Sequence, residues 1–218
     1  ASGYKYNHLT LMGFSLTHLS GTGIPDLGDF LFIPGTGEMK LEPGTHEDPD
    51  QGYRSRYSHD KEWASPNYYA VELADYGVKA EMTSGVRSGM FRFTYPESDN
   101  AFIMIDMNHT LWQSCEWSNL RMINDSTITG YKLVKGWGPE RHVYFTATFS
   151  KKLTGLRFVQ DKKPVIYNTS RFRSSYEAWG KNLMACISFD TKAGEEVTVK
   201  TAISAVSTDG AQIGRAHV

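Results

Sequence analysis

Residues 142–149 read His-Val-Tyr-Phe-Thr-Ala-Thr-Phe, so an apolar side chain occupies every second position. Successive side chains of a β-strand point to opposite faces, and this pattern therefore predicts a strand with one buried face. The same alternation recurs at 78–83, 91–95 and 197–203. Residues 101–107 are almost continuously apolar, as is typical of a central strand of a sandwich.

Turn-forming residues separate these predicted strands, at 95–100, 135–139 and 191–194. Residues 13–67 are rich in Gly, Pro, Asp and Ser and contain one short apolar run, Phe30–Ile33. No long helical period and no internal repeat interrupts the pattern. We therefore predict an all-β fold, an antiparallel β-sandwich in one large domain.

The composition excludes several classes of function. Apolar residues make up 40% and charged residues 22% of the 218 residues, and the net charge is −1. Because there is no basic excess, nucleic acid is not an expected partner. No apolar run is long enough for a membrane span, and no signal peptide is visible. The two cysteines, Cys115 and Cys186, leave one disulfide or none as alternatives.

Residues 14–29 gather small polar side chains among glycines and prolines. Gly21 and Gly23 allow the backbone to approach a ligand closely or to adopt positive φ. The polar groups either satisfy one another or face a hydroxyl-rich ligand. No Gly-x-Ser-x-Gly sequence supports a serine nucleophile, and no strand–glycine–helix unit supports a dinucleotide site.

A second polar cluster comprises residues 46–50 and 57–62, which contain several carboxylates and histidines. A solvated turn, a structural cation site and direct contact with substrate all remain open for it, because the spacing matches no EF-hand or zinc motif. Four arginines, at 54, 56, 87 and 92, are expected in salt bridges or at sheet edges.

The final residues, 212–218, read Gln-Ile-Gly-Arg-Ala-His-Val. The codons CAG ATC GGA AGA GCA CAC GTC encode this string, and from their second base they match the start of a common sequencing adapter. We therefore expect 212–218 to be adapter read-through and the native sequence to end near Ala211. The first residue is Ala1, and we expect the chain to be a piece of a longer protein.

The signature of one enzyme family is visible at this point. The run from Gly13 to Asp29, with its His-Leu-Ser-Gly-Thr-Gly core and Asp-x-Gly-Asp continuation, resembles that of glycoside hydrolase family 92. Similarity continues in Ser2-Gly3-Tyr4, in Tyr57–His59 with Glu62–Pro66, and in the segments near 81–89, 136–150 and 206–207. The resemblance covers essentially all of residues 2–211.

The resemblance implies the N-terminal domain of an exo-α-mannosidase that trims mannose from glycans such as N-glycans. It implies a galactose-mutarotase-like β-supersandwich whose first strands are missing here, followed by an α-helical barrel. It further implies an inverting reaction assisted by Ca²⁺, with the acid Glu, the base Asp and most calcium ligands in that missing C-terminal barrel. No catalytic or metal-binding residue of this chain is therefore assigned, and we expect the chain alone to be inactive.

The domain expected at 1–211 would contribute one wall of the sugar pocket. Ile24 and Leu27 stand where family members often have Cys or Tyr, which leaves the linkage preference open. A non-catalytic carbohydrate-binding sandwich is the alternative function, and a sandwich that only docks a neighbour is a third. Export to the periplasm, cell surface or medium is expected from the family. The predicted substrate-binding residues are Ser2, Gly3, Tyr4, His18, Ser20, Gly21, Thr22 and Asp26.

Overall fold

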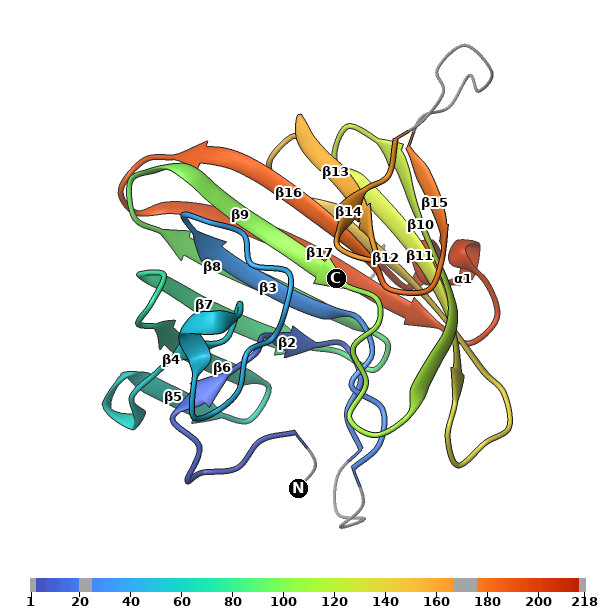
Figure 1. The fold of residues 1–218 in the computed structure, drawn as a ribbon, viewed down its shortest axis with the longest axis horizontal. Coiled ribbons are helices and arrows are strands. Elements are labelled where there is room, and N and C mark those ends of the chain that lie inside the picture. The colour runs from blue at the N-terminus through green and yellow to red at the C-terminus, as the bar shows by residue number, and fades with distance from the viewer. Residues whose placement is uncertain (1–2, 20–24, 167–175, 216–218) are drawn as a thin grey trace.

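The computed structural model describes residues 3–19, 25–166 and 176–215. Two large antiparallel sheets lie face to face, and their layers are visible in Figure 1. The predicted all-β sandwich is therefore confirmed. Within the described ranges, no helix is both long and apolar enough to cross a membrane.

The larger sheet has nine strands in the order β15-β10-β11-β12-β17-β8-β7-β6-β5. Neighbouring strands are antiparallel throughout. The strands are β5 (Glu62–Ser65), β6 (Tyr68–Leu73), β7 (Val78–Ser84), β8 (Ser88–Tyr95), β10 (Ser114–Asn124), β11 (Thr127–Lys135), β12 (Arg141–Phe149), β15 (Glu177–Gly180) and β17 (Glu195–Ser204).

The second sheet has six strands in the order β14-β13-β16-β9-β3-β2, and a small sheet pairs β1 with β4. Its central strand β9 is the continuously apolar stretch, and residues 101–105 are all buried there. The remaining elements are β1 (Thr10–Leu11), β2 (Phe14–Ser15), β3 (Leu31–Thr36), β4 (Ser55–Arg56), β9 (Ser98–Asp106), β13 (Gly155–Gln160), β14 (Lys163–Pro164), β16 (Leu183–Thr191), the 3-10 turns η1 (Pro49–Gln51) and η2 (His59–Lys61), and α1 (Thr208–Arg215).

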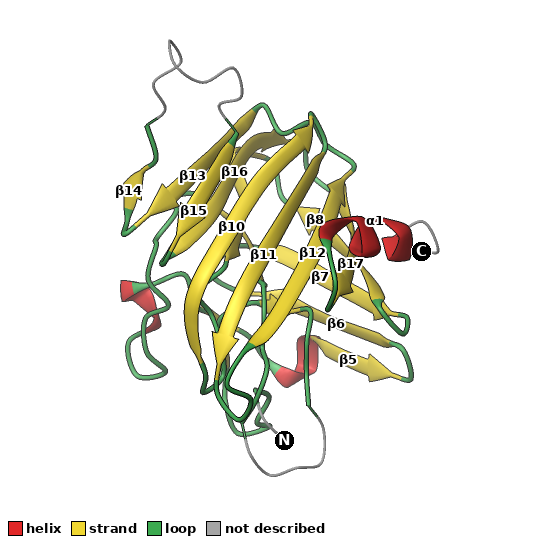
Figure 2. Cartoon of the chain, turned by 90° about the vertical axis from the view of Figure 1, so that its right-hand side faces the viewer, coloured by secondary structure: helices red, strands yellow, loops and turns green. Residues whose placement is uncertain are grey.

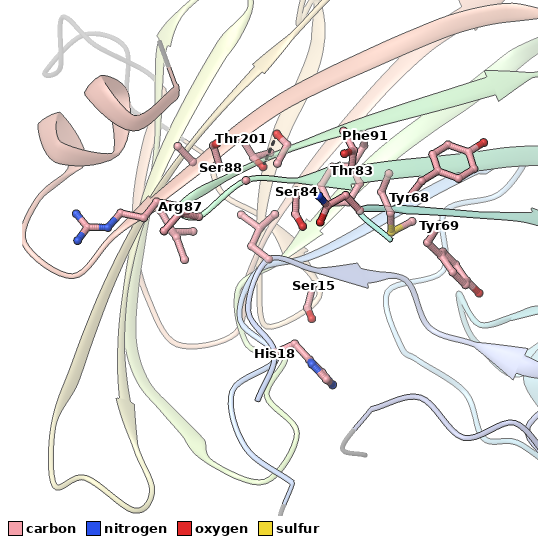
Figure 3. A pocket seen from close by; sticks show the side chains of 18 of the residues that line it. Ser15, His18, Tyr68, Tyr69, Thr83, Ser84, Arg87, Ser88, Phe91 and Thr201 are labelled. Carbon is pink, nitrogen blue, oxygen red and sulfur yellow. Dashed lines mark hydrogen bonds between the residues drawn. The ribbon is translucent and has the colours of Figure 1, made fainter. Parts of the chain in front are cut away.

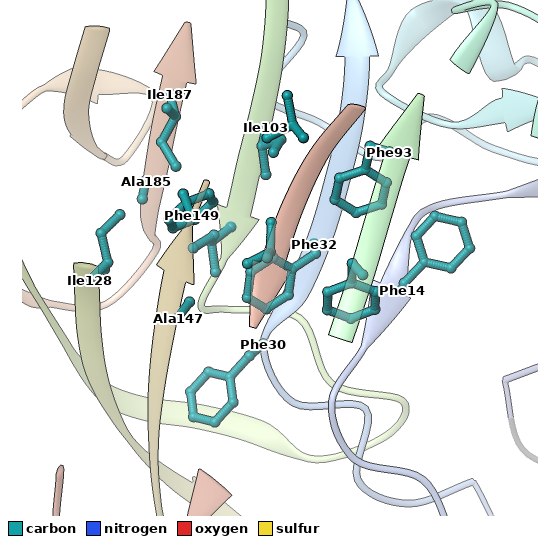
Figure 4. Close-up of a cluster of buried hydrophobic side chains, with 14 of the residues drawn as sticks. Phe14, Phe30, Phe32, Phe93, Ile103, Ile128, Ala147, Phe149, Ala185 and Ile187 are labelled. Carbon is teal, nitrogen blue, oxygen red and sulfur yellow. The ribbon is translucent and has the colours of Figure 1, made fainter. Parts of the chain in front are cut away.

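The main core lies between the two large sheets and is rich in phenylalanine (Figure 4). The ring of Phe32 on β3 lies 5.1 Å from Phe91 on β8 and 6.3 Å, edge-on, from Phe145 on β12. Tilted and edge-to-face rings add to the free energy gained from burying their area. These contacts join the second sheet to the middle of the larger one.

Residues 37–57 cover the outer face of the six-stranded sheet. Tyr53 is buried there among Ile33, Phe102 and Met104, and its hydroxyl donates to Asp106 at 3.1 Å. Burial and the nearby carboxylate raise the pKa of Tyr53. The loop-rich first third of the chain thus contributes to a second, smaller hydrophobic core.

Cys115 and Cys186 are both buried and unpaired, which settles the alternative left open by the sequence. Burial raises the pKa of each thiol, so neither resembles a reactive cysteine. The described part of 212–218 continues α1 to Arg215. The interpretation of that segment as adapter read-through stays a prediction.

Candidate functional site

Within the signature run, Gly13–Asp29, the residues next to Thr17 and Gly28 pair with each other as at the base of a hairpin. The backbone amide of Gly28 donates to the carbonyl of Thr17 at 3.2 Å, and His18 forms a bridge with Leu27. Leu27 and Phe30 have positive φ, which is uncommon for residues with a side chain. Such strain persists only where the surrounding structure enforces it, and it is frequent at functional sites. We call the described residues 17–19 and 25–29 the signature hairpin.

Asp29 anchors this hairpin and is completely buried. Its carboxylate accepts hydrogen bonds from Thr17 at 2.8 Å and from both terminal nitrogens of Arg141, at 2.7 and 3.0 Å. Burial alone would raise the pKa of Asp29, but the hydrogen bonds from Arg141 and the charge of Lys132 outweigh burial and lower it. The second acid of the Asp-x-Gly-Asp signature is therefore a structural anion.

The buried ammonium of Lys132 completes this ion cluster. Its Nζ lies 3.6 Å from Asp29 and donates to the carbonyl of His109. Burial lowers the pKa of Lys132, and Asp29 opposes that effect. The ring of His109 bonds in turn to the carbonyl of Gly28 at 2.7 Å. The hairpin is thus tied through its backbone and its one buried carboxylate to β11 and β12.

A cavity of about 510 Å³ opens beside the hairpin, between its base and the inner face of β7, β8 and β17 (Figure 3). Its lining is mixed, with hydroxyls, amides and one cation around an apolar floor. None of the described residues that line it is an Asp or Glu. The lining includes His18, Tyr69, Ser84, Arg87, Phe91 and Thr201.

The predicted site residues divide into three groups. His18 lines the cavity. Asp26 bonds to the amide of Leu27 at 2.7 Å, Tyr4 contacts Glu62, and a Cβ added at Gly3 would meet Leu111, so none of these three belongs to the described cavity lining. The remaining four, Ser2, Ser20, Gly21 and Thr22, lie outside the described residues.

Glu62 belongs to the second polar cluster and was not among the predicted substrate-binding residues. It accepts from Tyr69 at 2.6 Å, from His59 at 2.6 Å and from Tyr4 at 3.2 Å. Burial would raise its pKa, but the hydrogen bonds from these partners outweigh burial and lower it. Because Tyr69 lines the cavity and donates to Glu62, this hydrogen bond fixes the orientation of the Tyr69 side chain in the cavity wall. The His-x-x-Glu spacing at 59–62 was the available signal.

The surroundings of His59 favour the protonated ring. One ring nitrogen lies 2.6 Å from Glu62 and the other 2.6 Å from the carbonyl of Tyr6, so both nitrogens face acceptors. The hydrogen bond to Glu62 raises the pKa of His59. The ring of Tyr6 stacks on His59 at 4.0 Å. These contacts hold the N-terminal segment against η2.

The other cluster, at 46–50, is a turn on the surface. His46 bonds to Thr10 at 2.8 Å, and Asp50 pairs with Arg56 at 2.7 Å. Arg56 and Arg92 form the expected salt bridges, whereas Arg87 lines the cavity. In the described ranges, no three His, Cys, Asp or Glu side chains gather to hold a metal ion.

Comparison with known proteins identifies the family. The sequence profile of the glycosyl hydrolase family 92 N-terminal domain matches residues 1–204. No curated protein matches. Among solved structures, the family GH92 alpha-mannosidase BT3965 from Bacteroides thetaiotaomicron is 97% identical, with a TM-score of 0.96 over 100% of this chain. That protein was also solved in complex with mannoimidazole.

A second solved structure, the inverting mannosidase BT2199 from the same organism, is 23% identical with a TM-score of 0.78 over 99% of this chain and supports the fold. The chain spans 29% of the length of the first relative and 27% of the second. The profile match covers nearly the whole chain. The chain therefore belongs to glycoside hydrolase family 92, and its residues 1–204 match the N-terminal domain of that family.

Proposed function

We propose that this chain is the N-terminal domain of an inverting exo-α-mannosidase acting on mannose-containing glycans. We further propose that the cavity beside the signature hairpin forms part of its sugar pocket. The observation that carries the activity is the 97% identity to a protein described as a family GH92 alpha-mannosidase. The cavity supports the second part, because His18 of the family signature lines it.

The chemistry assigned to this wall is binding and orientation. Inverting hydrolysis needs two carboxyl groups about 6.5–9.5 Å apart with a water between them. The described lining of the cavity contains no carboxylate, so we assign neither the acid nor the base to this wall. Hydroxyls, His18 and Arg87 offer hydrogen bonds to sugar hydroxyls, while Phe91 excludes water. Fixing a sugar ring in this way lowers the barrier by positioning it.

Calcium is expected from the family resemblance, with its ligands mainly in the second domain. The described residues of this chain do not gather three metal-binding side chains, so we assign none of them to the ion. Calcium, when bound in the full-length enzyme, would supply a Lewis acid for sugar hydroxyls. No step assigned to this chain depends on it.

The pocket role is tested in the full-length enzyme with His18→Ala, because His18 lines the cavity. This variant should lower kcat/KM at least tenfold, about 1.4 kcal/mol of transition-state stabilisation, with little change in thermal stability. His46→Ala is the matched control, because His46 lies on the surface turn and bonds to Thr10. Full activity of His18→Ala, or a loss of activity that follows a loss of folding, would assign the hairpin a purely structural role.

The alternative, a carbohydrate-binding sandwich without chemistry of its own, makes a different prediction. A full-length protein that binds mannose oligosaccharides but never hydrolyses α-mannosides would support it. We also propose export to the periplasm, cell surface or medium, as the family resemblance implies. Fractionation of cells that express the full-length protein tests this, and recovery in the cytoplasm alone would contradict it.

A further inference from the structure

Arg54 is a buried charge that has no counter-ion among the described residues. Its exposed fraction is 8%, and its Nε is buried without a hydrogen-bond partner in that part of the chain. The other buried charged side chains there all belong to ion pairs, and they are Asp29, Glu81 and Lys132. A guanidinium keeps its proton at physiological pH, so Arg54 cannot avoid the cost of burial by becoming neutral. Arg54 therefore departs from the salt bridge expected from its sequence.

The guanidinium of Arg54 uses little of its capacity to donate. A guanidinium has five N–H donors in a planar fork. In the described contacts, one side-chain hydrogen bond is formed, from Nη1 to the hydroxyl oxygen of Thr10, and at 3.5 Å it is long. The same oxygen lies 2.8 Å from Nδ1 of His46, which holds the hydroxyl beside the guanidinium. Burial lowers the pKa of Arg54.

Further positive groups gather beside Arg54. The amide of His8 donates to the carbonyl of Lys5 at 3.0 Å and closes a turn of the N-terminal segment. The ring of His8 lies 3.9 Å from that of His46. Burial lowers the pKa of His46, and the charges of Arg54, His8 and Lys5 lower it further. We call Lys5, His8, Thr10 and Arg54 the basic cluster.

Glu47 is the carboxylate that acts on this cluster, and it does not pair with Arg54. Hydrogen bonds from its own backbone amide and from Thr45 lower the pKa of Glu47. Its charge raises the pKa of Arg54, but burial outweighs that effect. Because Glu47 is exposed and bonded within its own turn, the positive charge of Arg54 remains uncompensated in the described contacts.

The basic cluster lies apart from the cavity. Strand β1 pairs with β4, with Leu11 opposite Ser55, so Thr10 and Arg54 belong to the segments that cover the six-stranded sheet. Helix α1, in contrast, packs on β12 and β17 of the nine-stranded sheet (Figure 2). None of the four residues of the basic cluster belongs to the described cavity lining. A function of this cluster is therefore separate from that of the sugar pocket.

We propose that the basic cluster binds a small tetrahedral oxyanion, phosphate or sulfate, as the counter-ion of Arg54. The planar fork of arginine matches the oxygens of such an anion, and these charge-assisted hydrogen bonds are among the strong ones. Lys5 and His8 add positive charge from the N-terminal turn. A free ion and an ester group on a larger molecule share this chemistry. The inference does not depend on the proposed mannosidase activity.

The test is a titration of inorganic phosphate with the full-length protein, in which phosphorus NMR measures the dissociation constant. Arg54→Met should weaken binding roughly tenfold or more, because the charge-assisted hydrogen bonds are lost. Arg56→Met is the matched control, since Arg56 is two positions along and pairs on the surface with Asp50 and Asp75. That variant should bind phosphate like the wild type.

Two results would overturn the proposal. If the wild type does not bind phosphate, the counter-ion of Arg54 comes from a part of the full-length protein outside the described residues. If Arg54→Met binds as tightly as the wild type, the phosphate lies elsewhere. Binding is measured without any mannoside, so failure of the proposed activity and failure of this proposal remain distinguishable.

A second variant keeps the test decisive if Arg54→Met does not fold. Lys5→Ala combined with His8→Ala changes a turn in which Lys5 is exposed and His8 is half-buried. This double variant should weaken phosphate binding by about threefold or more, because two groups that attract the anion are removed. Unchanged affinity in the folded double variant would contradict the proposed cluster.

Competition experiments at equal ionic strength identify the chemistry of the anion and its source. Sulfate should displace phosphate, and acetate should displace it much less. Displacement by acetate as effective as that by sulfate would indicate a carboxylate site and overturn the proposal. Displacement by glucose 6-phosphate would support a site for an ester group on a larger molecule, whereas displacement by sulfate alone would support a site for the free ion.

Discussion

Asp29 shows how one residue links the family signature to stability. Its carboxylate is the buried counter-charge of both Arg141 and Lys132. Asp29→Asn keeps the shape but leaves two cations beside a neutral amide. Removing one partner of a buried ion pair costs about 3–5 kcal/mol, and we expect a loss of that order in the free energy of unfolding. Denaturant unfolding of the variant measures it.

The matched control is Asp50→Asn. Asp50 pairs with Arg56 at 2.7 Å, but its side chain is 72% exposed. Exposed ion pairs contribute about 0–1 kcal/mol, so this variant should unfold almost like the wild type. Equal losses in the two variants would mean that the cluster under the hairpin has no special role.

His59 and Glu62 should make stability depend on pH. The pKa of His59 is raised in the folded chain, so its contribution is complete below the unfolded pKa, about 6.5, and is lost as the pH rises through the folded pKa. The pKa of Glu62 is lowered, so its contribution is present above about 4.3 and is lost as the pH falls. The pair therefore contributes most between these two values.

This dependence is measured by comparing the wild type with His59→Gln across pH 5 to 9. The difference in the free energy of unfolding should be largest near the acidic end and should shrink toward pH 9. His46→Gln serves as control, because burial lowers the pKa of His46 and no carboxylate accepts from its ring in the described contacts. A constant difference for His59→Gln would show that the ring acts without its charge.

At the scale of elements, the base of the signature hairpin depends on Gly28. Gly28 and Gly37 share a φ of +83°, but only Gly28 has close neighbours, with Leu111 Cγ 2.8 Å from the position of an added Cβ. Each substitution to Ala should cost about 1 kcal/mol or more for the backbone conformation. Gly28→Ala should cost an additional 1–3 kcal/mol or so for overpacking. Equal thermal unfolding of the two variants would contradict this account.

The sequence predicted strands best where one face is apolar and the other polar. β8, β12 and β17 follow that rule, so period two located them. β10 and β11 do not, because Lys132 faces inward to meet Asp29 and Thr129 is buried on the outer face. A long-range ion pair overrides the local pattern there, and no window of sequence contains both partners.

The site was less predictable than the fold for the same reason. The signature drew attention to His18, which does line the cavity. The organising role of Glu62 was missed because Tyr4 and Tyr69 meet it from separate segments. The floor of the cavity comes from β7, β8 and β17. The sequence pattern of these residues predicts strands and gives no sign of a cavity. Spatial convergence of this kind is absent from any local spacing.

At the scale of the whole molecule, the outer faces of the two large sheets differ in how far other parts of the chain cover them. Residues 37–57 cover the outer face of the six-stranded sheet and build the second core. On the outer face of the nine-stranded sheet, Trp117 and Trp179 remain 46% and 54% exposed. Because exposed apolar side chains favour association, the isolated domain should be prone to aggregation. A concentration-independent, monomeric melt of residues 1–211 would contradict this expectation.

The last prediction is that residues 1–211 alone have no α-mannosidase activity, with or without calcium. Asp29 under the hairpin and Glu62 behind the cavity wall are both engaged by protein partners. Asp29 is fully buried and paired with Arg141, and Glu62 has a lowered pKa and is bonded to Tyr4, His59 and Tyr69. The described lining offers no other carboxylate, whereas inversion needs two. The measurement is hydrolysis of α-mannosides by the purified segment, with the full-length enzyme as positive control. Turnover by the segment that Glu62→Gln abolishes, with its circular dichroism unchanged, would move the chemistry into this chain.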